Sequence, residues 1–149
     1  MEETYRPLIS EIFKKASNGN VKKKKVDVLK QYDSPQLRMI CKAAYDPNIK
    51  WLLPEGDVPY IENEAPEGTE HSRLEHSAKT LYNFVKGGND KLPQFKRENM
   101  FIQLLESLHK DEAKFLGLVK DQAVHNEYKV SAVVIREAFD WDENFVKNK

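Results

Sequence analysis

The 149-residue sequence contains a single cysteine, Cys41. One thiol cannot form an intramolecular disulfide, and a chain without such bridges is typical of a reducing compartment. Long hydrophobic runs are also missing, since no window approaches the roughly 18 apolar residues that a membrane span needs. The opening stretch, MEETYRPLIS, is acidic and has no apolar segment of the kind found in a secretory signal. We therefore expect a soluble cytoplasmic protein without a membrane partner.

The sequence also lacks an excess of either charge, with 24 Lys and Arg against 24 Asp and Glu. A dedicated nucleic-acid binder usually carries net positive charge, so the composition disfavours DNA or RNA as the main partner. The charges are nevertheless distributed unevenly. Residues 1–50 hold 11 basic against 6 acidic residues, residues 51–75 hold 1 against 7, and residues 76–149 hold 12 against 11. This asymmetry predicts either pairing between the two ends or two faces for different partners.

Motifs of the common enzyme classes are absent from the sequence. Gly87-Gly88 is not followed by the Lys-Ser or Lys-Thr that a phosphate loop requires, and no Gly-x-Ser-x-Gly motif occurs. Cys41 shares a helical stripe with apolar neighbours, which predicts a buried and inert thiol instead of a nucleophile. We therefore expect no enzymatic activity and no cofactor.

What the sequence does contain is apolar residues at helical spacing. A chain of this length suits one domain that buries roughly two-thirds of its unfolded surface. Ser34 followed by Pro35 is the clearest helix start. We predict a single all-α domain, residues 1–149, of about six short helices. The expected helical segments are 8–17, 21–32, 35–45, 69–86, 95–109, 111–119 and 131–139.

Capping residues predict several helix boundaries. The NGN motif at 18–20 predicts a left-handed stop, and the GG pair at 87–88 predicts the end of the helix before it. Thr69, Asp111 and Ser131 are predicted N-caps. The segment KVSAVVI, residues 129–135, is rich in β-branched residues and suits a strand, but the REAF that follows favours a helix.

Residues 46–68, which we call the strap, contain four prolines and two glycines without sustained periodicity. Loops of this length in a compact domain are usually functional, or else ordered by their own side chains. We predict that the strap packs over the helices, with a short extended pair around the turn at 54–56. The residues too apolar for a free linker are Trp51, Leu52, Leu53, Tyr60 and Ile61.

The stretch EGTEHSRLEHSAK contains Glu-His twice. On a helix His71 and Glu75 lie about 40° apart, whereas His71 and His76 lie about 140° apart and cannot share a metal. The spacing also misses both zinc-protease motifs by one residue. We favour a charged helix surface over a metal site. A metal site at His71 and Glu75 would need a third ligand from Glu62, Glu64, Glu67, His109 or His125.

The best nucleic-acid feature is the run of four lysines at 22–25. Four adjacent lysines span a full helical turn, so at least one lies near the apolar stripe while the others can contact phosphate without reading sequence. Aromatic residues for base stacking are not interleaved with this run. A solvated helix face is the simpler interpretation. The candidate nucleic-acid-binding residues are Lys14, Lys15, Lys22, Lys23, Lys24 and Lys25.

Aromatic residues among acidic ones indicate protein contacts. They occur in the strap and in residues 140–149, which form an acidic-aromatic tail. Aromatic anchors within a polar rim supply much of the binding energy of interfaces. The alternative is that both tryptophans only fasten the strap and the tail to the helices. The candidate protein-binding residues are Trp51, Tyr60, Ile61, Trp141 and Phe145.

Four blocks of the sequence carry a resemblance to a known family: IKWLLPEGDVPY, APEGTEHSRLEHSAKTLYNFVKGGN, KRENMFIQLLESLHKDEAKFLGLVKD and REAFDWDENF. They resemble small proteins of T4-like tailed phages, including marine and cyanobacterial phages, that carry only a domain-of-unknown-function label. The resemblance covers the chain from SPQLRMICKAAYDPNIKW to its C-terminal end. It implies a phage protein made in the cytoplasm of the infected bacterial host, and it assigns no catalytic residue.

These observations together favour a non-catalytic accessory protein that binds a host or viral protein. The first alternative is nonspecific nucleic-acid binding through the lysines. The second is a metal-dependent enzyme that uses His71 and Glu75.

Overall fold

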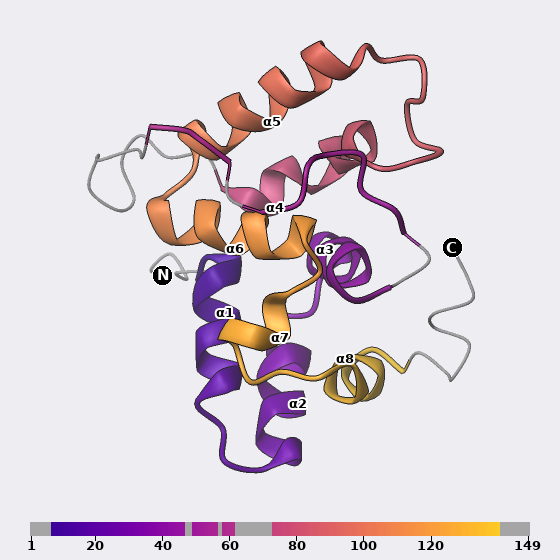
Figure 1. The fold of residues 1–149 in the computed structure, drawn as a ribbon. Helices are drawn as coiled ribbons and strands as arrows, with labels where there is room; N and C mark the ends of the chain where they lie inside the picture. Colours follow the sequence, from indigo (N-terminus) through magenta and orange to yellow (C-terminus); the bar gives the residue numbers. More distant parts are fainter. Residues whose placement is uncertain (1–6, 47–48, 57, 62–72, 141–149) are drawn as a thin grey trace, which may run out of the picture.

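The computed structural model describes residues 7–46, 49–56, 58–61 and 73–140, and these residues form helices joined by short connections (Figure 1). No strand or sheet occurs among them, so the predicted single all-α domain is confirmed. Within this part of the chain, no helix is long and apolar enough to cross a membrane. The elements are α1 (Ile9–Ser17), α2 (Lys22–Gln31), α3 (Pro35–Tyr45), α4 (Leu74–Ser77), the 3-10 helix η1 (Ala78–Phe84), α5 (Gln94–Ser107), α6 (Lys110–Lys120), α7 (Val124–Glu127) and α8 (Ala132–Ala138).

Helix α6 is the centre of the packing. It contacts α1, α3, α5 and α7, and in Figure 1 it crosses the middle of the molecule between α5 and the α1–α2 pair. Helix α2 packs against α1 on one side and against α8 on the other. The core between these elements is aromatic where α1 meets α6, since the rings of Phe13 and Phe115 lie 4.8 Å apart and both are fully buried.

Helix starts follow the predicted caps where the cap is a serine. The Ser34 hydroxyl accepts a hydrogen bond from the Leu37 N–H at 3.0 Å, with Pro35 in the first helical position. The Ser131 hydroxyl accepts from the Val134 N–H at 3.4 Å. Residues 132–135 are therefore helical, which settles the choice between helix and strand in favour of the helix.

Other predicted caps were wrong. Helix α1 ends as predicted before 18–20, but the C-cap Asn18 has a right-handed φ of −77°, so the stop is not left-handed. Asp111 does not cap α6, because only two residues separate α5 from α6 and the turn between them puts His109 at the cap. The His109 Nδ1 accepts from the Asp111 N–H at 3.0 Å. Helix α7 was not predicted.

The helix predicted at 69–86 also differs from the structure. Helical spacing predicts that Leu74, Ala78, Leu81 and Val85 face inward; the first three are buried, and Val85 is half-buried. The predicted cap Thr69 lies outside the described residues. From Ala78 onward the helix narrows to the 3-10 form, and it ends at Phe84 because Val85 pairs with Trp51 in an antiparallel bridge.

The described residues of the strap pack over the helices as predicted, since Trp51, Leu53, Val58 and Tyr60 lie against the core, but the pairing of the strap is different. No extended pair forms around 54–56 among its described residues; instead the Trp51–Val85 bridge joins the strap to the segment after η1. The Leu52 N–H donates to the Phe84 carbonyl at 2.8 Å, and the Lys86 N–H donates to the Lys50 carbonyl at 2.8 Å. The strap therefore pairs with a segment distant in the sequence and not with its own neighbouring residues.

A buried carboxylate ties three helices together. Glu112 on α6 is 0 % exposed. Its Oε2 accepts from the Ile9 N–H at 2.9 Å, and its Oε1 accepts from the Leu74 N–H at 2.9 Å. Ile9 and Leu74 are the first residues of α1 and α4, so one side chain serves the N-terminal ends of two helices, where backbone N–H groups lack partners and negative charge is favoured.

Glu112→Ala should destabilise the fold by roughly 2–5 kcal/mol, because it leaves two buried N–H groups without acceptors and opens a small cavity. Glu112→Gln should cost less, about 1–3 kcal/mol, because the amide keeps one acceptor and turns its NH₂ toward the second donor. Urea unfolding followed by circular dichroism measures both values. Two variants as stable as the wild type would show that the carboxylate does not hold these helices.

Glu112 also predicts a pH dependence of stability. Burial raises the pKa of its carboxyl above the ordinary value of 4.5, and its hydrogen bonds to Leu74 and Ile9 offset part of this. The folded chain therefore holds the proton more tightly than the unfolded chain. The contribution of Glu112 is complete below pH 4.5 and is lost as the pH rises through the raised folded-state pKa. The free energy of unfolding of the wild type minus that of Glu112→Gln should thus fall as the pH rises above about 4.5. A difference that grows with pH would contradict this.

Candidate functional site

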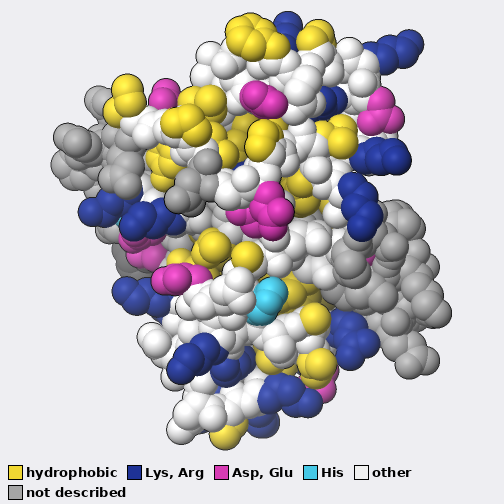
Figure 2. Space-filling model, viewed as in Figure 1, with side chains coloured by type: hydrophobic (Ala, Val, Ile, Leu, Met, Phe, Trp, Pro, Cys, Tyr) yellow, Lys and Arg dark blue, Asp and Glu magenta, His cyan; other side chains and the backbone are white. Residues whose placement is uncertain are grey.

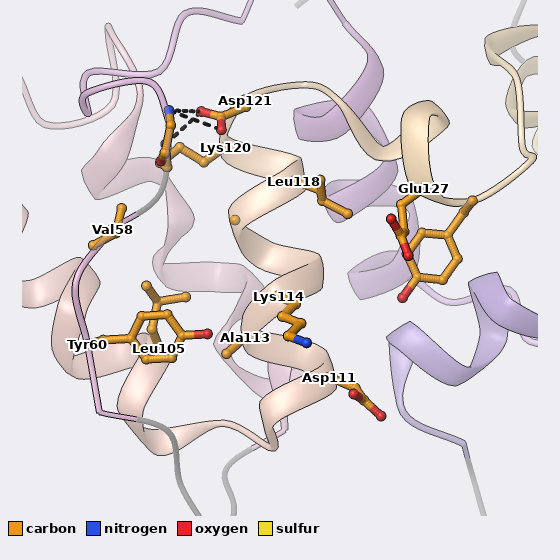
Figure 3. Close-up of a pocket in the computed structure, with 13 residues that line it drawn as sticks. Val58, Tyr60, Leu105, Asp111, Ala113, Lys114, Leu118, Lys120, Asp121 and Glu127 are labelled. Carbon is orange, nitrogen blue, oxygen red and sulfur yellow. Dashed lines mark hydrogen bonds and ion pairs between the residues drawn. The ribbon is translucent and has the colours of Figure 1, made fainter.

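A groove of about 630 Å³ lies along α6. We call it the α6 groove. In Figure 3 α6 runs along its floor, with the strap residues Val58 and Tyr60 on one side and Glu127, beside Tyr128, on the other. Leu105 from the end of α5 closes the lower end beneath Tyr60. Figure 2 shows hydrophobic side chains gathered on the face where the strap and α6 meet.

The floor of the groove contains a glycine in the middle of α6. Gly117 has no side chain, and a Cβ added there would meet no atom within 4 Å. A glycine in a helix interior costs roughly 0.5–1 kcal/mol relative to alanine. Neither a left-handed φ nor a close neighbour requires glycine at this position. The result is a strip of bare helix backbone between Ala113 and Lys120 that a ligand can approach closely.

One end of the groove is acidic. The carboxylates of Asp111 and Glu127 lie near the Tyr128 phenol. Burial raises the pKa of Tyr128, and the two carboxylates raise it further. The phenol therefore keeps its proton at neutral pH and can donate a hydrogen bond. Lys114, which is exposed on α6, supplies a positive charge to the rim.

The strap wall of the groove is held by a buried lysine. Lys120 at the end of α6 is 4 % exposed, and its Nζ donates to the Pro54 carbonyl at 2.7 Å, to the Gly56 carbonyl at 3.1 Å and to Asp121 Oδ1 at 2.6 Å. The Asp121 carboxylate in turn accepts from the Gly56 N–H at 3.2 Å (Figure 3). These bonds fix the turn of the strap on α6, and so they set the width of the groove.

Comparison with known proteins assigns the chain to a family. Residues 12–126 match DUF6433, described as a family of unknown function. The chain belongs to this family. No curated protein and no solved structure matches it. The part shared with DUF6433 contains the strap, α5 and α6, and it ends one residue before Glu127 at the rim of the groove.

The predicted protein-binding residues fall into three groups. Trp51 is half-buried: its indole N–H donates to the Ala43 carbonyl at 3.2 Å and its ring meets Phe101 edge-on at 6.5 Å, so it fastens the strap. Tyr60 lines the groove, and Ile61 beside it is 78 % exposed. Trp141 and Phe145 lie outside the described residues.

The predicted lysines are mostly solvent-facing. Lys14, Lys15 and Lys22–Lys24 are exposed, and Lys25 is half-buried, as expected for the member nearest the apolar stripe. Lys15 lies over the Tyr32 ring at 5.6 Å from its centroid. Lysine and arginine side chains are spread over the lower part of the molecule, where α1 and α2 lie (Figure 2).

The residues of the metal hypothesis are not brought together in the described part of the chain. His71 and the strap glutamates 62, 64 and 67 lie outside it. Glu75 lies 3.7 Å from the Arg73 guanidinium, and His109 caps α6. Among the described residues, no three His, Cys, Asp or Glu side chains cluster as metal ligands would. Cys41 is buried as predicted, and burial raises the pKa of its thiol.

Of the residues that line the groove, sequence reasoning identified only Tyr60 as a candidate binding residue. Gly117 carried a usable signal, because an isolated glycine inside a helical pattern often marks a packing or functional constraint. Lys120 and Tyr128 carried none, since a lysine at a helix end and a tyrosine in a turn are ordinary there.

Lys120→Met should loosen the strap, because it removes the ammonium while nearly keeping the volume of the side chain. Two carbonyls then lose their buried donor, and we expect a loss of roughly 2–4 kcal/mol. Hydrogen exchange of the strap amides should speed up more than that of the α3 amides. Lys114→Met, on the exposed side of the same helix, is the matched control and should change neither quantity. Equal exchange in both variants would rule out the anchoring role of Lys120.

Proposed function

We propose that this chain is a non-catalytic protein-binding module and that the α6 groove receives a segment of its partner. The observation that carries the proposal is the bare helix floor at Gly117, walled by apolar and aromatic side chains from separate parts of the chain. Such a floor lets a partner backbone or a large side chain approach the helix closely. The strap and Ile61 extend the apolar surface beyond the groove.

The electrostatics of the rim favour a partner segment that carries a basic residue next to an apolar one. Asp111 and Glu127 would face the basic group, while Tyr60 and Leu118 would face the apolar side chain. Charges at a rim set orientation and association rate, whereas the buried centre supplies most of the affinity. The groove volume of about 630 Å³ lies within the range of ligand sites, roughly 300–1,000 Å³.

The biological setting is part of the proposal. The four sequence blocks that resemble T4-like phage proteins support a phage accessory protein made in the cytoplasm of an infected bacterium. The partner would then be a host protein or another phage protein.

Gly117→Trp should abolish partner binding, because the indole would occupy the groove without an intramolecular clash at its Cβ. Gly117→Ala should retain most of the binding and stabilise the fold by roughly 0.5–1 kcal/mol. The measurement is quantitative mass spectrometry of proteins that copurify, after nuclease treatment, with tagged wild type and variants from infected cells. Circular dichroism and thermal unfolding check that each variant is folded.

Met39→Trp is the matched control, since it adds the same ring at an exposed position of α3 that does not line the groove. A partner retained by wild type, Gly117→Ala and Met39→Trp but lost with Gly117→Trp supports the proposal. If Gly117→Trp recovers every copurifying protein at the wild-type level, the groove is not the binding site.

A further inference from the structure

A second cavity, of about 400 Å³, lies between the start of α2 and the connection from α7 to α8. Its lining includes Lys22, Lys25, His125 and Lys129, which come from sequence segments about a hundred residues apart. None of the described residues that line it is an aspartate or a glutamate. It shares no lining residue with the α6 groove. We call it the lysine cavity.

We infer that the lysine cavity is a binding site for a phosphate group. Three ammonium groups around one hollow form a local positive charge in a chain whose net charge is zero, and the His125 imidazole adds a ring nitrogen for hydrogen bonding. Positive side chains without a lining carboxylate are complementary to a small, multiply charged oxyanion. The site was not evident from the lysine run alone, because the run and Lys129 meet only in the folded chain.

The internal contacts of these lysines leave room for such a ligand. The Lys25 Nζ donates to the Lys129 carbonyl, which holds its aliphatic stem along the cavity wall. The Lys22 Nζ pairs with Glu137 at 2.7 Å, but both side chains are about half exposed, at 53 % and 50 %. An exposed ion pair of this kind contributes little to stability, so a phosphate can compete with Glu137 for Lys22.

The start of α2 adds to the argument. Its N-cap is Val21, whose side chain has no oxygen to offer the first N–H groups, and its first turn holds lysines and no acidic residue. This reverses the usual arrangement, in which negative or polar groups occupy a helix N-terminus. Val21 lines the cavity, so an anion bound there would also satisfy the end of α2.

The phosphate could belong to a nucleic-acid backbone or to a small molecule. Binding would be independent of base sequence in the first case, since only phosphate is contacted. The two sources are separated by the probe. Inorganic phosphate tests the cavity itself, and a fluorescein-labelled 12-nucleotide single-stranded DNA tests whether a polymer is the better ligand.

Lys129→Gln should weaken the binding of both probes by roughly fivefold, and should reduce the slope of log affinity against log salt for the oligonucleotide by about 1. Lys129 is exposed, so this variant should fold. Lys23→Gln changes the net charge equally on the same face of the molecule, but Lys23 pairs with Asp27 and does not line the cavity. Lys23→Gln should therefore change binding by less than about twofold. Glu137→Gln should strengthen it, because it frees Lys22.

Amide chemical shifts in ¹H–¹⁵N NMR spectra report on inorganic phosphate, and fluorescence anisotropy at roughly 50 mM salt reports on the oligonucleotide. Shift changes confined to residues 20–25 and 129–131, with tighter oligonucleotide binding lost in Lys129→Gln, indicate a nucleic-acid backbone site. The same shifts without oligonucleotide binding indicate a small phosphate ligand. Both outcomes support the site. Absence of local shifts, or equal effects of Lys129→Gln and Lys23→Gln, overturns it. Gly117→Trp should leave phosphate binding unchanged, so this result is independent of the α6 groove.

Discussion

The position of α6 depends on one buried carboxylate, and most of the fold depends on α6. Glu112 accepts hydrogen bonds from the N–H groups of Ile9 and Leu74, the first residues of α1 and α4. These two residues are 65 positions apart in the sequence. The desolvation of a buried carboxylate is costly, and these two bonds are what offset it. Neither N-cap side chain accepts a hydrogen bond from its helix, and the local Glu11 carboxylate accepts only from the Leu8 N–H at the start of α1. Glu112 therefore supplies, from a distance, the acceptor for the first N–H group of both helices.

The same constraint sets which side of α6 faces outward. Glu112 and Gly117 are five positions apart, which at about 100° per residue places them roughly 140° apart around the helix. Once Glu112 is fixed in the core, Gly117 has to lie on the groove side. Lys120, three residues later, then reaches the carbonyls of the strap. Two buried ionisable side chains on one helix, Glu112 and Lys120, therefore determine the core contacts of α6 and the position of the strap wall of the groove.

The sequence predicted what local physics determines and missed what depends on distant partners. Periodicity identified most helices, and Ser34 and Ser131 marked their starts because a serine cap acts on residues three positions away. Glu112 could not be recognised, since its donors are 103 and 38 residues away. The strap pairing was wrong for the same reason. Of the residues that line the α6 groove, Tyr60 was predicted from its apolarity, whereas the grouping of Lys22 and Lys25 with Lys129 in the lysine cavity requires the folded chain.

The two sites are separate but border the same short segment. Tyr128 lines the α6 groove, and the next three residues, Lys129 to Ser131, line the lysine cavity. This segment is firmly held: the Lys129 N–H donates to the Ser17 hydroxyl at 2.9 Å, and the Tyr45 hydroxyl donates to the Val130 carbonyl at 2.7 Å. Since a fixed segment keeps both walls in place, the proposed protein partner in the groove and the proposed phosphate group in the cavity would not displace each other. Separate surfaces for a protein and for a phosphate group would agree with the uneven charge and zero net charge of the sequence.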